Sequence, residues 1–432
     1  AVFAPLDHIG LIVLDEEQES SYKSENAPRY HARDVAKYRC VQHRAVLLLG
    51  SATPAVESMY QAREGRYRLF TLSQRFNQQA MPQVRIVDMK RELRAGNCTA
   101  ISAELRRELA CNLERGEQSI LFLNRRGSSR MVSCGECGQV PECPRCSVRL
   151  TYHSANGRLM CHYCGYSEPL PPACPSCGGR LNFIGVGTQR VQEELEALFP
   201  GIEILRMDAD TISAAHPHEE LLSRFQKQRV PILVGTQMVA KGLDFARVSL
   251  VGVLGIDSLL FAQGFRAYET VFSLITQVVG RSGRAKDPGF AIIQTTDPDN
   301  PVLNLAAAQD YDAFFEQEIA YRKLGLYPPF CGLCVVGFSG PKEIEVARAA
   351  ARFSALLGRQ AAQQPDLPLR VLGPTPGSIE KINDSYRYKL TVKCRNDRRF
   401  RDLVRSTLDC YEQEKLPSKA TVVVDLHSDG DI

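Results

Sequence analysis

The sequence predicts an α/β protein with a doubly wound parallel sheet. A module that binds two zinc ions is inserted into this part of the chain, and a small α+β domain follows it. Three observations predict it. Short apolar strands end repeatedly in polar, glycine-containing strings, which is typical of ligand sites at the carboxyl ends of parallel strands. Four Cys-x-x-Cys turns fall within 44 residues. A Pro328-Pro329 pair marks a boundary before the last segment of strands and helices.

Length and composition are those of an ordinary globular chain. The 432 residues suggest about three domains, and 44% hydrophobic with 24% charged residues are average values. The net charge of +4 is mildly basic and identifies no class of partner by itself. No signal peptide and no apolar run of membrane-spanning length is visible, so the expected location is cytoplasmic.

Eight of the fifteen cysteines form four turns: Cys134/Cys137, Cys143/Cys146, Cys161/Cys164 and Cys174/Cys177. One Cys-x-x-Cys turn directs two thiolates at one point, and two turns complete a tetrahedral zinc shell. Four turns therefore predict two structural zinc ions. A disulfide framework would need an oxidising compartment, of which the sequence gives no sign. The gaps between turns are 5, 14 and 9 residues, which favours nested pairing but leaves sequential pairing open.

The first part of the chain carries two strand-end strings about 35 residues apart. A strand over 11–14 leads into Asp15-Glu16-Glu17-Gln18, an arrangement that holds Mg²⁺ through water and places a carboxylate near an attacking water. A strand over 46–49 leads into the string GSATP at 50–54, whose hydroxyl groups can link the carboxylate site to a neighbouring groove. Two such strings indicate adjacent strands of one parallel sheet.

Further strands are expected over 119–123, 232–234 and 250–255, on either side of the cysteine turns. The second of these leads into GTQMVAKGLDF. The string QVVGRSGRA at 277–285 places Arg281 and Arg284 on one helix face, and such guanidinium pairs neutralise charge on a transferring phosphoryl group. Helices are expected over 104–115, 191–199, 216–228 and within 301–325.

The segment after Cys331 predicts a small α+β domain, with strands over 335–338 and 420–426 and helices over 346–360 and 398–412. Its cations form either a basic DNA-binding face or an ordinary solvated surface: Lys381, Arg387, Lys389, Arg398 and Arg399.

The order DEEQ, GSATP, FLNRRG, four Cys-x-x-Cys turns, GTQMVAKGLDF and QVVGRSGRA resembles the bacterial replication-restart DNA helicases of the PriA (primosomal protein N′) family, which are superfamily 2 motors. The resemblance covers essentially the whole chain, and the zinc insertion within the second motor lobe is its distinguishing mark. It implies RecA-like helicase lobes and an ATP-dependent, 3′-to-5′ helicase of the primosome that acts in replication restart at stalled forks.

The resemblance also implies partners and a domain plan. The partners are forked and single-stranded DNA, single-stranded DNA-binding protein and primosome proteins, in a nucleoid-associated location without a membrane. The domains would be the carboxy-terminal part of lobe 1 at 1–77, lobe 2 at 78–133 and 181–325, the two-zinc insertion at 134–180, and a DNA- and partner-binding domain at 326–432.

Residue roles follow from the same resemblance. Asp15 and Glu16 match the Mg²⁺-coordinating and water-activating positions, while Gln18 stands where the family usually has His. The arginine-finger positions are Gln277, Arg281 and Arg284, and Gly242 and Asp244 lie near the nucleotide. The implied DNA contacts are Tyr22, Lys23, Arg29, Tyr30, His31, Arg33, Thr236, Gln237 and Lys241. The family assigns the zinc ligands in the nested way: Cys134, Cys137, Cys174 and Cys177 for one ion, Cys143, Cys146, Cys161 and Cys164 for the other.

One family element is missing, because no Gly-x-x-x-x-Gly-Lys-Ser/Thr phosphate loop occurs in this sequence. The sequence therefore resembles a carboxy-terminal fragment in which the first lobe is incomplete. Two zinc ions are expected in the chain itself, and ATP and Mg²⁺ in a full-length parent. The chain alone is expected neither to bind ATP tightly nor to hydrolyse it. The alternative function is a non-catalytic, zinc-dependent scaffold for fork DNA and proteins. The zinc insertion disfavours a third reading, an RNA helicase.

Overall fold

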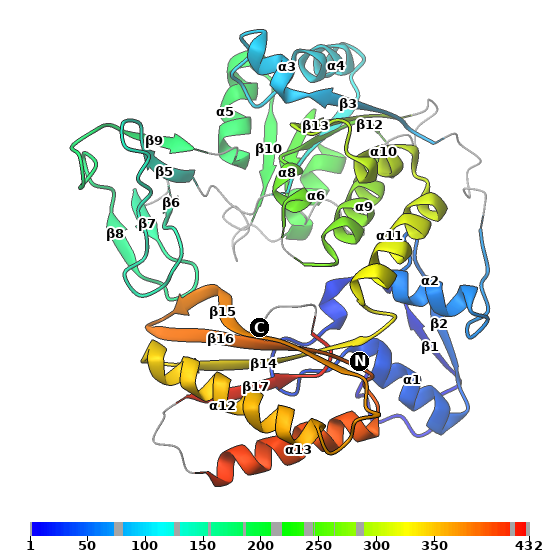
Figure 1. Ribbon diagram of the computed structural model, residues 1–432. Coiled ribbons are helices and arrows are strands. Elements are labelled where there is room, and N and C mark those ends of the chain that lie inside the picture. Colours follow the sequence, from blue (N-terminus) through cyan, green and yellow to red (C-terminus); the bar gives the residue numbers. More distant parts are fainter. Residues whose placement is uncertain are drawn as a thin grey trace.

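The computed structural model describes residues 2–72, 81–124, 130–153, 157–184, 187–208, 218–236, 245, 247–262, 264–281, 289–414 and 420–428. Within these residues the strands form four sheets (Figure 1). Two are parallel and two antiparallel. No helix in this described part is both long and apolar enough to cross a bilayer.

A two-stranded parallel sheet opens the chain. Its elements are β1 (Leu11–Leu14), η1 (Ser20–Tyr22), α1 (Ala32–His43), β2 (Val46–Leu49) and α2 (Val56–Arg63). Leu11 pairs with Val46 and Leu14 with Leu49. Parallel strands are normally buried on both faces, yet four apolar side chains on these strands are exposed: Leu11, Val13, Val46 and Leu48.

A six-stranded parallel sheet, in the order β10-β11-β4-β12-β13-β3, forms the largest unit. Its strands are β3 (Gln83–Asp88), β4 (Gln118–Leu123), β10 (Ile204–Met207), β11 (Ile232–Gly235), β12 (Val248–Leu254) and β13 (Phe290–Thr295). Its helices are α3 (Met89–Arg94), α4 (Ala103–Glu114), α5 (Thr188–Leu198), α6 (His218–Lys227), α8 (Asp257–Leu260), α9 (Ala267–Val279), α10 (Pro301–Ala308) and α11 (Tyr311–Gly325).

Helices cover both faces of this sheet, because its central strands are apolar runs. Every residue of β4 and β11 is buried. One core cluster joins the sheet to α6, α9 and α10 through side chains such as Phe225, Ile275 and Ala306. A second cluster joins the opposite face to α4 and α5 through Leu105 and Val191. The sheet is therefore doubly wound.

The cysteine turns lie in a five-stranded antiparallel module between β4 and α5, in the order β8-β7-β6-β5-β9. The strands are β5 (Arg130–Cys134), β6 (Thr151–His153), β7 (Arg158–Met160), β8 (Ser167–Pro169) and β9 (Leu181–Ile184). Figure 1 shows the module standing to one side of the six-stranded sheet, above the end of a long hairpin from the last domain.

That last domain is a four-stranded antiparallel sheet, in the order β15-β16-β14-β17, with two helices packed on it. Its elements are β14 (Gly332–Gly340), α12 (Glu343–Ala361), β15 (Leu369–Ile382), β16 (Ser385–Cys394), α13 (Arg398–Gln413) and β17 (Thr421–Asp425). Phe353 of α12 and Phe400 of α13 are fully buried against the sheet.

The structure confirms the predicted fold class: parallel α/β sheets, an inserted cysteine module and a small α+β domain. The strands β3 and β10 and the β15–β16 hairpin were not among the predicted elements. The prolines Pro374 and Pro376 argue against a strand, but β15 is the edge strand of its sheet, where a missing N–H leaves no partner unsatisfied.

Candidate metal centres and the contacts between the sheets

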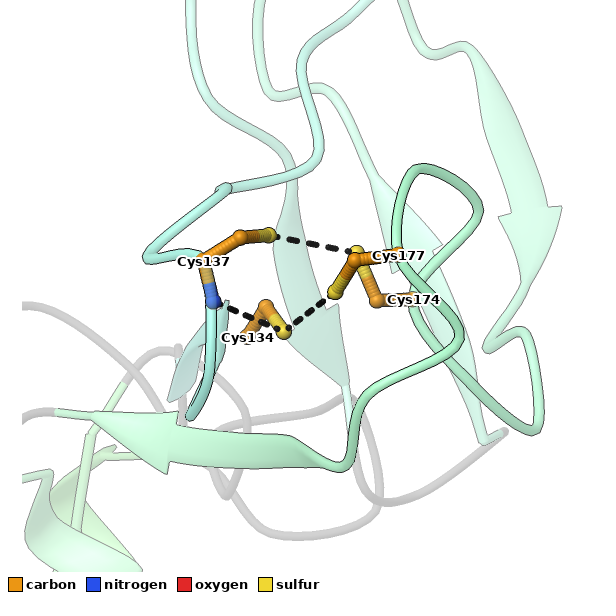
Figure 2. Close-up of side chains that lie close together, drawn as sticks. All are labelled: Cys134, Cys137, Cys174 and Cys177. Atoms are coloured by element: carbon orange, nitrogen blue, oxygen red, sulfur yellow. Dashed lines mark hydrogen bonds between the residues drawn. The ribbon is translucent and has the colours of Figure 1, made fainter.

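The outer cysteine group consists of Cys134, Cys137, Cys174 and Cys177 (Figure 2). The Sγ atoms of Cys134 and Cys177 lie 3.4 Å apart, and those of Cys137 and Cys174 lie 3.7 Å apart. A tetrahedral zinc ion with Zn–S bonds of 2.3 Å requires Sγ atoms about 3.8 Å apart. The backbone N–H groups of Cys137 and Glu136 lower the pKa of the Cys134 thiol to about 6, which favours the thiolate that binds metal.

The inner group consists of Cys143, Cys146, Cys161 and Cys164. The Sγ atoms of Cys143 and Cys164 are 3.6 Å apart. The backbone N–H of Tyr166 lowers the pKa of the Cys164 thiol to about 7. Unlike the outer group, this one lies in an apolar cluster, with Val132, Leu150 and Leu159 packed around it.

The eight cysteines thus form two four-thiol sites in the nested arrangement, with the inner turns on one site and the outer turns on the other. In each site the sulfur count, the spacing and the N–H···S bonds match what a structural zinc ion needs. The sequential pairing, which the turn spacing had left open, is not the one found.

The acidic string after β1 meets the end of α9. The side-chain amide of Gln277 donates to Glu16 Oε2 at 3.3 Å, and Gln18 Nε2 donates to the same oxygen at 2.7 Å. Ser51, from the GSATP string after β2, donates to Gln18 Oε1 at 2.5 Å. Gln277 therefore contacts the Glu16 carboxylate directly, and the GSATP string is linked to the same carboxylate through Gln18.

A second contact between the sheets lies close by. Thr53 Oγ1 and Ser273 Oγ are 2.9 Å apart, which joins the GSATP string to α9. A cavity of about 190 Å³ opens beside these contacts, lined among others by Gln18, Arg266 and Gln277. Arg281 follows α9 directly. Arg284 lies outside the described residues, as do Gln237, Lys241, Gly242 and Asp244.

The three cations predicted to contact DNA phosphates that lie within the described residues are each paired with a carboxylate. Lys23 Nζ lies 2.8 Å from Asp425 Oδ1, and Arg29 Nη1 lies 4.0 Å from Asp425 Oδ2. Arg33 Nη1 lies 2.7 Å from Glu17 Oε2 and is largely buried. Since Glu17 also accepts the backbone N–H of Ala55, Arg33 helps to hold the GSATP string in place.

The other predicted DNA-contacting residues within the described part of the chain make contacts inside the protein or are buried. The Tyr22 hydroxyl donates to the backbone oxygen of Asp15 at 2.8 Å. The Tyr30 ring packs edge-on against Phe3, with centroids 4.8 Å apart, and His31 caps α1 by accepting the N–H of Arg33. Thr236 is buried at the end of β11.

Sequence reasoning missed a buried ion-pair network, which we call the arginine hub: Glu57, Arg266, Glu269, Glu318 and Arg322. Arg322 of α11 is fully buried and contacts Glu57, Glu269 and Glu318 at 3.4, 2.8 and 2.8 Å. Burial alone raises the pKa of Glu57, but Arg266 and Arg322 outweigh it and hold that pKa at about 2. No local string signals this network, because its members are spread over 266 positions.

Three family models match the chain. They are the PriA DNA helicase Cys-rich region domain over residues 143–169, the helicase conserved C-terminal domain over 182–286, and the primosomal protein N C-terminal domain over 323–428. The replication restart protein PriA of Bacillus subtilis is 42% identical over 428 residues, which cover 99% of this chain and 53% of that protein. The PriA of Synechocystis is 41% identical over 403 residues, which cover 91% and 48%.

This chain belongs to the PriA family. It spans about half the length of the curated PriA relatives it matches. Among solved structures, S. cerevisiae Dbp5 bound to RNA and ADP BeF3 matches with 15% identity and a TM-score of 0.33, over 73% of this chain and 63% of that one. A likeness at that level adds nothing to the assignment to the PriA family, which rests on the sequence relatives and the family models.

Proposed function

We propose that this chain carries the second motor lobe, the zinc module and the carboxy-terminal domain of a PriA-type, ATP-dependent 3′-to-5′ DNA helicase that acts in replication restart. The observation that carries the proposal is the bond from Gln277 to Glu16, because it joins the acidic string of one sheet to the QVVGRSGRA helix of another.

In this proposal Asp15 and Glu16 hold the metal-bound water network and orient the attacking water. Bound Mg²⁺ and ATP would supply the neutralising charge and the phosphoryl group. Gln277 holds Glu16 in position, and Arg281 and Arg284 neutralise charge on the phosphate oxygens. Gln18 bridges Ser51 and Glu16 as a neutral donor and acceptor, a role that needs no charge.

The remaining roles are part of the same proposal. Gly242 and Asp244 would lie near the nucleotide, and Thr236, Gln237, Lys241 and the loop from Tyr22 to Arg33 would lie along the DNA. Forked and single-stranded DNA, single-stranded DNA-binding protein and primosome proteins are the partners, which implies a cytoplasmic, nucleoid-associated location. The two zinc ions hold the module in shape through Cys134, Cys137, Cys174 and Cys177 and through Cys143, Cys146, Cys161 and Cys164.

An ATPase comparison tests the motor. The sequence has no phosphate loop, so the chain should show no DNA-stimulated hydrolysis alone. Fused in frame behind a PriA segment that carries such a loop, it should hydrolyse ATP when forked DNA is added. Glu16→Gln in that fusion should lower kcat by two or more orders of magnitude, as expected for loss of a water-orienting carboxylate, and should leave DNA affinity unchanged.

The second candidate is a scaffold that binds fork DNA and partner proteins without turnover. The lack of a Gly-x-x-x-x-Gly-Lys-Ser/Thr loop in this sequence favours it for the isolated chain, because nothing else in the sequence replaces the lysine that holds the β- and γ-phosphates. Fork binding with equal affinity in the fusion and the chain, together with no hydrolysis in either, would support the scaffold and refute the motor.

A further inference from the structure

The four Cys-x-x-Cys turns share one backbone bond. In each turn the N–H of the first cysteine donates to the carbonyl five residues on: Cys134 to Gln139, Cys143 to Val148, Cys161 to Tyr166 and Cys174 to Gly179, at 2.8, 2.9, 2.8 and 2.9 Å. Because this bond closes every turn in the same way, any other difference between the turns reflects their surroundings.

Three of the turns supply the N–H···S bond to their second cysteine from within the turn itself. Each has a glycine after its second cysteine in the left-handed region, with φ of +72° for Gly138, +73° for Gly165 and +72° for Gly178. In these turns the second sulfur also accepts an N–H from two residues further on, which belongs to Gln139, Tyr166 or Gly179. A thiolate stabilised in this way needs nothing from outside its own turn.

The turn from Cys143 to Cys146 departs from this pattern. Ser147 replaces the glycine, and its backbone N–H donates outward to the carbonyl of Lys381 at 2.9 Å. The sulfur of Cys146 accepts the N–H of Asn383 at 3.1 Å. Both Lys381 and Asn383 belong to the end of the β15–β16 hairpin, and Asn383 lies 237 positions after Cys146 in the chain. The outside hairpin thus supplies the N–H···S bond that the other turns make for themselves.

We call residues Lys381–Asp384 the hairpin tip, and it makes further contacts with this turn. The N–H of Asp384 donates to the carbonyl of Arg145 at 2.8 Å, so the tip and the turn exchange two main-chain bonds besides the one to sulfur. The Ile382 side chain packs against the apolar cluster around the inner cysteines. Figure 1 shows the hairpin end lying directly beneath the zinc module.

The tip is built to hold this shape. Only Asn383 and Asp384 separate β15 from β16, and both are left-handed, with φ of +47° and +58°. Two consecutive left-handed residues are the conformation that a two-residue hairpin loop with tight twist needs, and Asn and Asp tolerate it well. Lys381 Nζ and Asp384 Oδ1 form an ion pair of 3.0 Å across the loop. The hairpin itself therefore holds the backbone N–H of Asn383 in the orientation that the bond to the Cys146 sulfur requires.

We propose that the hairpin tip is a working part of the inner zinc site, so that zinc in this site and docking of the carboxy-terminal domain on the zinc module stabilise each other. Such coupling is reciprocal by thermodynamic linkage. Groups that hydrogen-bond to a metal ligand typically change metal affinity 10–100-fold when they are lost. The outer site has no such contact among the described residues, so its zinc does not depend on the hairpin.

Zinc release from the full chain tests one direction of the coupling. Zinc-loaded protein is mixed with a chromogenic chelator, and the two release phases are assigned with Cys146→Ala and Cys177→Ala, each of which removes one site. Ile382→Asp places a charge against the apolar cluster and lifts the tip. It should speed release from the inner site by about tenfold or more and leave the outer site unchanged. Leu372→Asp, at an exposed position of the same strand, is the matched control and should change neither phase.

Hydrogen exchange of the unaltered protein tests the other direction, and it stands even if Ile382→Asp fails to fold. Stripping the inner zinc should speed exchange of the Asn383 and Asp384 amides, while amides of β14 keep their protection because the domain stays folded. The proposal is wrong if Ile382→Asp leaves the inner phase unchanged or speeds both phases equally. It is equally wrong if zinc removal leaves the tip amides as protected as before.

Discussion

The two cysteine sites have the same ligands and the same turn chemistry, yet they stand in opposite surroundings. In the outer site Cys137 and Cys177 are exposed to solvent, and every N–H···S bond comes from the turns themselves. In the inner site three cysteines are buried, apolar side chains enclose them, and a distant hairpin completes the hydrogen bonding. The outer site holds its own loop together, whereas the inner site also holds two domains together.

The largest difference between the two sites is expected when one zinc ligand is removed from either of them. Cys146→Ala and Cys177→Ala should each lower the zinc content from two ions to one per chain by elemental analysis. The free energy of structural zinc binding, about 10–16 kcal/mol at neutral pH, is also folding free energy. Only Cys146→Ala should therefore loosen both the module core and the hairpin tip, as read by hydrogen exchange. An equal loosening of the tip by Cys177→Ala would remove the distinction between the sites.

A smaller effect is expected from the apolar cluster. Leu159 is fully buried beside the inner cysteines, so Leu159→Ala should destabilise the module by about 2–5 kcal/mol through lost contacts and a cavity. The measurement is the urea concentration at which each zinc is released, and the inner ion should leave earlier. Tyr163→Ala, at an exposed position of the same site, is the control and should shift neither ion. Equal shifts of both ions in Leu159→Ala would mean that the two sites unfold as one unit.

The smallest effect is expected from Ser147→Gly, which gives the fourth turn the residue that the other three have. In the intact protein the substitution should cost less than about 1 kcal/mol, from added freedom of the unfolded chain. Combined with Ile382→Asp it should slow inner zinc release about two- to tenfold, since one recovered hydrogen bond is worth about 0.5–1.5 kcal/mol. Release from the double variant that is as fast as from Ile382→Asp alone would show that the turn cannot take over the role of the hairpin.

Local strings predicted the local features well. The Cys-x-x-Cys spacing predicted two four-thiol sites, because each turn needs only four residues to aim two sulfurs. The strands that end in the acidic and GSATP strings were also predicted, since apolar runs of four residues leave few alternatives. The gap lengths, however, could not separate nested from sequential pairing, because both satisfy the same spacing and only the folded β5–β9 pairing decides between them.

Contacts between distant segments were beyond the sequence alone. Nothing near Cys146 shows that its hydrogen-bond donor is Asn383, since a backbone N–H carries no residue-type signal. The absence of a glycine at position 147 was the one visible sign that this turn differs. Arg322 likewise reads as a solvated position on an amphipathic helix, and its burial follows only from how α2, α9 and α11 meet. The domain limits and the roles proposed for the site residues stay predictions.

The arginine hub has a mechanical consequence. Arg322 is fully buried, and three carboxylates from α2, α9 and α11 share its positive charge. Sliding α2 away from α9 and α11 would take the Glu57 carboxylate away from Arg266 and Arg322, and a buried charge left without its counter-ion costs several kcal/mol. Turning about Arg322 keeps the carboxylates within reach. Relative movement of the two parallel sheets therefore costs the least free energy when it is a rotation about Arg322.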